Sequence, residues 1–168
     1  MKLCAEQDLP LPRGAAFPQV SDIDALLAQM QGRHLRIRRV APAGLRPEDA
    51  PKWTGIGTLR GLSRRFEIAL TAMYPPEGYD LAGQSEDLRI RAHVDLADTA
   101  AGHCRMTVTA DLSATSLSGR ILMQSLHFLR VPLEVRLGAV LAVLAERLAG
   151  DGGGVQTCRS SPRRGSAG

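Results

Sequence analysis

Residues 116–148, "SLSGRILMQSLHFLRVPLEVRLGAVLAVLAERL", are rich in Leu and Val and contain no glycine cluster. Apolar side chains recur there at spacings of three and four, which predicts one long amphipathic helix. One stripe comprises Leu122, Leu126, Leu129, Leu133, Leu137, Val140, Leu144 and Leu148, and a flanking stripe comprises Ile121, Phe128, Val135 and Ala139. A surface this wide predicts packing against a curved sheet, and Pro132 is expected to bend the helix along that curve.

Seven segments with the two-residue period of a strand supply the predicted sheet. They are residues 1–9, 34–40, 53–61, 63–74, 79–86, 88–96 and 103–112. Short turns between consecutive segments predict antiparallel pairing, and one charged face per segment predicts a sheet with one solvated side. Residues 15–32 predict two short consecutive helices after the first strand, with Ser21 capping the second.

The inward face of each predicted strand is apolar. Residues 88–96, "LRIRAHVDL", alternate almost without exception, and residues 103–112 repeat the pattern. The segment 63–74 is predicted to place one set of side chains on the inner face: Phe66, Ile68, Leu70, Ala72 and Tyr74. The fold class is therefore α+β, with a curved antiparallel sheet of about seven strands around a long C-terminal helix.

Composition sets the domain organisation and excludes some partners. The 168 residues suit one domain, expected over 1–148, while the Gly-, Ser- and Arg-rich residues 149–168 predict a disordered tail. The net charge is +4, and residues 151–168 carry half of it. With aromatic residues at only 4%, the body lacks the side chains that stack on bases, so no specific nucleic-acid partner is expected.

The cysteines and the N-terminus predict a cytoplasmic protein. Cys4, Cys104 and Cys158 are far apart in sequence and lack metal-ligand spacing, which favours free thiols in a reducing compartment and no metal site. Residues 1–12 contain no apolar core of a signal peptide. The helix at 116–148 carries Arg130, Glu134 and Arg136, so it is not expected to span a membrane.

The order of these elements resembles that of the START and birch-pollen-allergen-like superfamily, called SRPBCC. The resemblance covers residues 1–148 and rests also on "FPQVSDIDAL" (17–26) and "YPPEGYDLAGQ" (74–84). It implies a helix-grip fold whose sheet and long helix enclose an apolar cavity. It also implies a function in binding or transporting a small hydrophobic molecule, such as a lipid, a quinone or a polyketide. None of the matching segments is a catalytic motif, and fold alone does not decide function.

The residues themselves favour a binding module over an enzyme. The predicted inner faces of residues 63–74, 88–96 and 103–112 carry almost no titratable group, with Cys104 as the exception. His93 and His103 fall on the charged faces, His127 falls on the polar side of the helix, and His34 begins a strand. No catalytic residue and no cofactor are therefore predicted. The alternatives are an enzyme of the polyketide cyclase or hydrolase kind, and an interaction protein with a filled interior. A monomer and a homodimer are both compatible with the sequence.

The expected cavity walls come from five strands and the long helix. They comprise Trp53, Phe66, Ile68, Leu70, Tyr79, Ile90, Val108, Leu122, Leu126 and Leu129. Trp53 is either a core anchor or a residue at the cavity mouth, where Gly55 and Gly57 would leave room for a ligand. Tyr79 either offers its hydroxyl to the cavity or packs at the edge of the sheet.

Overall fold

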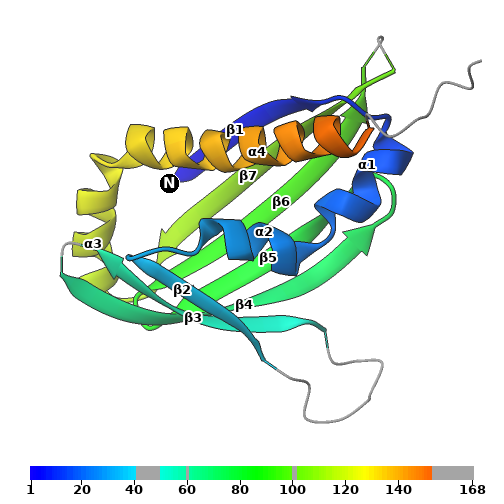
Figure 1. Cartoon of the computed structure of the whole chain (residues 1–168). Helices are drawn as coiled ribbons and strands as arrows, with labels where there is room; N and C mark the ends of the chain where they lie inside the picture. Colours follow the sequence, from blue (N-terminus) through cyan, green and yellow to red (C-terminus); the bar gives the residue numbers. More distant parts are fainter. Residues whose placement is uncertain (41–49, 60, 100–101, 153–168) are drawn as a thin grey trace, which may run out of the picture.

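Two short helices and a long C-terminal helix lie on one side of a seven-stranded antiparallel sheet (Figure 1). The computed structural model describes residues 1–40, 50–59, 61–99 and 102–152. The elements are β1 (Lys2–Leu9), α1 (Arg13–Val20), α2 (Ile23–Met30), β2 (Leu35–Val40), β3 (Lys52–Leu59), β4 (Leu62–Tyr74), β5 (Gly78–Ser85), β6 (Leu88–Asp98), β7 (Cys104–Ala114), α3 (Leu117–His127) and α4 (Arg130–Gly152).

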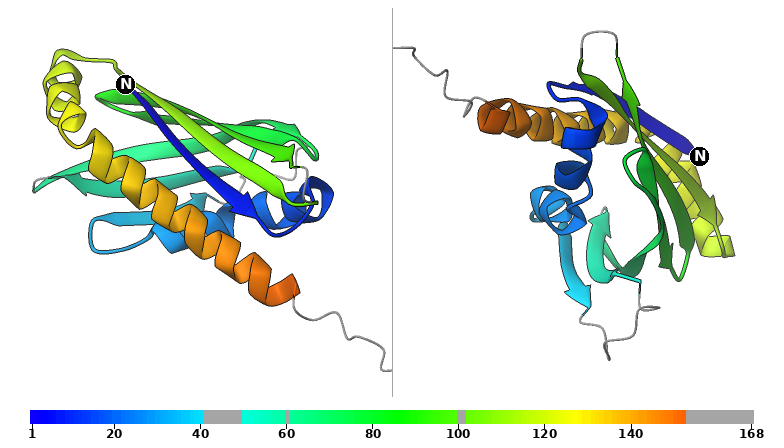
Figure 2. Two further views of the ribbon diagram at one scale, coloured as in Figure 1. Left: turned by 90° about the horizontal axis from the view of Figure 1, so that it is seen from above. Right: turned by 90° about the vertical axis from the view of Figure 1, so that its right-hand side faces the viewer.

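The strand order is β1-β7-β6-β5-β4-β3-β2, so β2 to β7 form a meander and β1 pairs with the last strand. Both views in Figure 2 show the sheet curving around the side that carries α1, α2 and α4. The helix α4 lies chiefly along β1. The predicted helix-grip architecture, with two short helices after the first strand, is confirmed.

The cap of α2 differs from the prediction by one residue. Asp22, not Ser21, is the N-cap, and its Oδ1 accepts a hydrogen bond of 3.0 Å from the amide of Ala25. Ser21 has helical backbone angles because it ends α1, where its amide donates to the carbonyl of Phe17. A residue that closes one helix cannot adopt the extended backbone of an N-cap, so the role passes to the next side chain.

A bulge in β4 moves two residues off the predicted inner face. Leu70 pairs with Leu81, but the register shifts there and Ala72 pairs with Asp80. Since one extra residue reverses the alternation of a strand, Ala72 and Tyr74 lie on the outer face. The Tyr74 hydroxyl accordingly donates to Asp80 Oδ2 at 3.0 Å and the side chain is about half exposed.

The predicted single bent helix is wrong: two helices, α3 and α4, meet at Phe128 and Leu129. Pro132 falls in the first turn of α4, where a backbone N–H has no intrahelical acceptor. The first regular bond of α4 runs from the amide of Leu133 to the carbonyl of Leu129, at 3.0 Å. The proline is tolerated because it begins a helix, not because it bends one.

The two predicted stripes of this segment have opposite environments. Leu126, Leu144 and Leu148 of the main stripe are buried, as expected for the side that packs on the sheet. The flanking stripe does not pack on the sheet: Ile121, Phe128, Val135 and Ala139 are all exposed. The helix α4 also continues past the expected domain end at Leu148 to Gly152, and the rest of the predicted tail lies outside the described residues.

Candidate functional site

The buried core consists of two separate clusters on the inner side of the sheet. The larger one joins α1, α2 and the C-terminal half of α4 to the strands, and includes Leu9, Val20, Leu96, Met106 and Leu144. The smaller one lies beneath α3 and has Leu3, Leu112 and Leu126 as its buried members. The two clusters do not merge, so the part of the inner face between them is covered by neither cluster.

Ile90 marks this uncovered region. It lies on the inner face of β6, in the same alternation as the buried Val94 and Leu96, and pairs with Leu112 of β7. Even so, its exposed fraction is 36%, and it belongs to neither cluster. Its partly exposed neighbours on this side of the sheet are apolar too: Phe66, Ile68, Leu70, Leu81 and Ala92. This stretch of the inner face is therefore apolar and only partly covered by the protein's own side chains.

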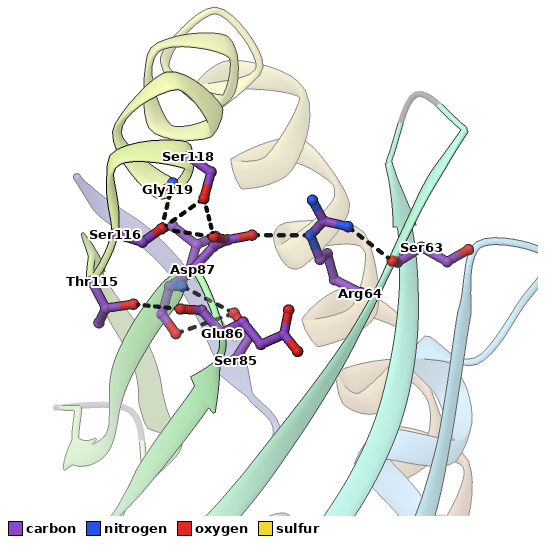
Figure 3. A network of polar contacts seen from close by, with 10 residues as sticks. Ser63, Arg64, Ser85, Glu86, Asp87, Thr115, Ser116, Ser118 and Gly119 are labelled. Atoms are coloured by element: carbon purple, nitrogen blue, oxygen red, sulfur yellow. Dashed lines mark hydrogen bonds and ion pairs between the residues drawn. The ribbon is translucent and has the colours of Figure 1, made fainter.

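A polar network attaches α3 at one end of this region (Figure 3). The carboxylate of Asp87, in the turn between β5 and β6, accepts hydrogen bonds from Ser116 Oγ at 2.7 Å and Ser118 Oγ at 2.5 Å. It also accepts one from Arg64 Nε, on β4, at 3.0 Å. A side chain on Gly119 would collide with the Asp87 carbonyl, so the glycine permits this close approach.

The same network shifts the ionisation of Asp87. The hydrogen bonds from Ser118 and Ser116, followed by the bond and charge of Arg64, hold the pKa of this carboxyl below its usual range. Asp87 is therefore an anion at neutral pH and ties the start of α3 to two strands. Nothing in the sequence pattern marked Asp87 for this role, because its partners are far apart in the chain.

The interior polar groups next to the larger cluster already have partners. The Tyr79 hydroxyl is buried and donates to the carbonyl of Val20 at 3.1 Å, and burial raises the pKa of Tyr79. The indole N–H of the buried Trp53 donates to Asp24 Oδ1 at 2.6 Å. Among the described residues, the buried side-chain polar atom without a partner is Gln29 Oε1. The uncovered face is consequently suited to an apolar ligand with few hydrogen-bonding groups.

The ten expected wall residues are distributed over the two clusters and the gap between them. Trp53, Tyr79 and Val108 are buried in the larger cluster, and Phe66, Ile68 and Leu70 pack against it. Leu126 is buried in the smaller cluster and Leu122 packs against it, while Leu129 is partly buried where α3 and α4 meet.

The environments of Trp53 and Tyr79 favour the packing role for both. The ring of Phe66 fills the space beside Gly55, where an added Cβ would lie 2.5 Å from Phe66 Cζ. The hydroxyl of Tyr79 donates a hydrogen bond to the carbonyl of Val20, so it is not free to bond to a ligand. Sequence reasoning omitted Leu81 and Ala92, although their pairing across β5 and β6 follows from the predicted alternation.

The described pockets lie on the other side of the sheet. One, of about 540 Å³, is lined by outward side chains of β1, β4, β5, β6 and β7, among them Lys2, Arg91, His93, Asp80 and Asp111. A smaller one, of about 250 Å³, lies over β2, β3 and β4. The charges in the larger depression balance, two cations against two carboxylates, so the depression shows no preference for a charged ligand.

The histidines do not assemble into a site. His93 Nδ1 lies 2.6 Å from Asp80 Oδ1 on the outer face, and His93 pairs across the ladder with Thr109. His93 and His103, which alternation puts on the same face of neighbouring strands, are therefore not partners in the ladder. Cys104 is buried, and burial raises the pKa of its thiol, which makes it a poor nucleophile.

The arrangement of the strands and helices is similar to that of several solved structures. TTHA0849 from Thermus thermophilus aligns at a TM-score of 0.61 and 15% identity, covering 90% of this chain and 99% of that chain. Ara h 8.0201 aligns at 0.58 and 13%, covering 89% and 98%. A START superfamily protein from Mycobacterium smegmatis aligns at 0.51 and 12%, covering 80% and 95%. At these identities the likeness shows the fold alone, which is the helix-grip fold.

The sequence itself matches no family model and no curated protein. Within the described residues, no helix has both the length and the hydropathy that crossing a bilayer requires.

Proposed function

We propose that this chain binds a small hydrophobic molecule, of the lipid, quinone or polyketide kind, on the inner face of its sheet between α4 and the strands. The observation that carries the proposal is Ile90, an inward-facing side chain of a central strand that the protein's own helices leave partly exposed. Its apolar neighbours and the paired state of Tyr79 and Trp53 favour a ligand held by surface burial rather than by hydrogen bonds.

The geometry supports binding better than catalysis. A general acid, base or nucleophile must reach the reacting atoms, and the side chains of the uncovered face are apolar. The titratable pair His93 and Asp80 lies across the sheet from it. We further propose that the protein acts in the cytoplasm, which agrees with the free thiols of Cys4 and Cys104.

A fluorescent fatty acid with an environment-sensitive dye tests the proposal by fluorescence polarisation. Ile90→Trp should fill the uncovered face and raise the Kd by about tenfold or more, equivalent to about 1.4 kcal/mol. Arg91→Trp is the matched control, because residue 91 is the next position on β6 and faces the outer depression. Its Kd should stay within about twofold of the wild-type value, a change of about 0.4 kcal/mol.

The two variants also locate the probe. If Arg91→Trp weakens binding and Ile90→Trp does not, the probe occupies the outer depression and the proposal is wrong. If the folded wild type does not bind the probe or apolar competitors, the inner face is not a ligand site. Circular dichroism and urea unfolding verify that each variant is folded.

A further inference from the structure

The exposed stripe on α3 and α4 has no role in the proposed ligand site. Its large apolar side chains lie away from the sheet, from the start of α3, through the corner where the two helices meet, to the start of α4. Their exposed fractions run from 66% to 82%, with Phe128 the most exposed: Leu117, Ile121, Phe128, Val131 and Val135. Soluble proteins seldom leave contiguous apolar surface of this kind without a binding partner.

The helix α4 is thus apolar on two sides. Leu141, Leu144 and Leu148 pack toward the sheet, whereas Val131 and Val135 lie about a third of a helical turn around from them. Packing on the sheet accounts for the first set only. The second set has to be explained by something outside the described residues.

Arginines border this stripe and identify the kind of partner. Arg120 precedes Ile121, Arg130 precedes Val131, and Arg136 follows Val135. Glu134 is the only acidic residue in positions 117–145, and it pairs with Arg130 at 3.1 Å. Neither Arg120 nor Arg136 forms an ion pair with a described residue. The border of the stripe is therefore net positive.

We propose that the corner of α3 and α4 docks on the surface of an anionic lipid bilayer. Phe128 and its apolar neighbours enter the boundary between headgroups and acyl chains, while Arg120 and Arg136 contact lipid phosphates. A second copy of the chain fits less well, because two identical stripes would bring arginine borders of the same charge together. This docking goes beyond the proposed ligand binding and does not depend on it.

Vesicle sedimentation tests the proposal with vesicles of phosphatidylcholine alone or mixed with phosphatidylglycerol. The wild type should sediment with the mixed vesicles at low salt and remain in solution with phosphatidylcholine alone. Phe128→Glu should lower the partition coefficient by about tenfold to a hundredfold, the effect of losing one buried aromatic side chain. Arg136→Gln should lower it by about fivefold, and this loss should shrink as salt rises.

Ile56→Glu is the matched control, because it introduces the same charge at an exposed apolar residue on the outer side of the sheet. It should lower the partition coefficient less than Arg136→Gln does, because residue 56 lies away from the corner and exposed charges are screened with distance. Equal losses for Ile56→Glu and Phe128→Glu would mean that only net charge matters, which overturns docking by the corner. Absence of wild-type binding to anionic vesicles also overturns it.

Two further measurements separate the alternatives. Sedimentation velocity of the free wild type should show a monomer. A dimer that dissociates in Phe128→Glu would instead mean that the stripe binds a second copy of the chain. Ile90→Trp, designed to block the inner face, should bind vesicles as the wild type does. A loss of vesicle binding in Ile90→Trp would show that the inner face, not the corner, holds the lipid.

Discussion

Replacing Ile90 by Ala measures directly how open the inner face is. The substitution removes three carbon atoms, worth about 0.8 kcal/mol each when fully buried. Ile90 has an exposed fraction of 36%, so about two thirds of that value applies, which gives about 1.5 kcal/mol. No cavity term is added, since the space next to the side chain is already open. This figure is an upper estimate, because unfolded chains bury part of the same surface.

Leu96→Ala is the matched substitution on the same face of the same strand. Leu96 is 1% exposed, so its truncation adds a cavity to the lost transfer energy and should cost about 3–5 kcal/mol. Urea unfolding measures the loss of unfolding free energy for each variant, provided that the m value is the same as that of the wild type. Equal losses for the two variants would show that the protein's own side chains fill the space over Ile90, which refutes the reasoning behind the candidate site.

Three other substitutions test the surrounding structure. Tyr79→Phe should lower the free energy of unfolding by about 1–2 kcal/mol in urea, because it leaves the buried Val20 carbonyl unpaired; an unchanged midpoint would contradict that bond. Pro132→Ala should change stability by less than about 1 kcal/mol, since the residue lies in the first turn of α4; a gain near 3 kcal/mol would place it in a helix interior. The lowered pKa of Asp87 means that its contribution to stability is complete above its ordinary pKa and is lost as pH falls through the folded-state value. The stability difference between wild type and Asp87→Asn should therefore shrink as pH falls below about 4, and a difference that persists at low pH would contradict the role of the carboxylate.

The sheet and its faces could be predicted because they depend on alternation that each strand carries by itself. Val94 and Leu96 are buried and Arg91 and His93 are exposed, as the period of two requires. The prediction of inner and outer faces failed in β4, where one extra residue shifts the alternation of side chains. The bulge at Thr71 reversed the faces of Ala72 and Tyr74, and a bulge of this kind has no local signature in the sequence.

The break between α3 and α4 shows a different limit. The apolar spacing of residues 116–148 runs through Phe128 without interruption, so periodicity alone predicts one helix. The start of α3 is fixed instead by Asp87, which holds Ser116 and Ser118 from another part of the chain. For the candidate site, the apolar wall residues could be predicted, but not which of them the core would bury, because that depends on where the helices cross the sheet.

The pairing of β1 with β7 has a consequence for the order of folding. Five of the six strand pairs join neighbours in sequence and can form soon after both strands leave the ribosome. The sixth joins Leu3 to Ala110, so the first strand waits for almost the whole sheet to be synthesised, and α4 then packs along it. Closing such a long loop makes this step slow relative to the hairpins. Until it occurs, the apolar side of β1 and one edge of the growing meander are open to pairing with other chains.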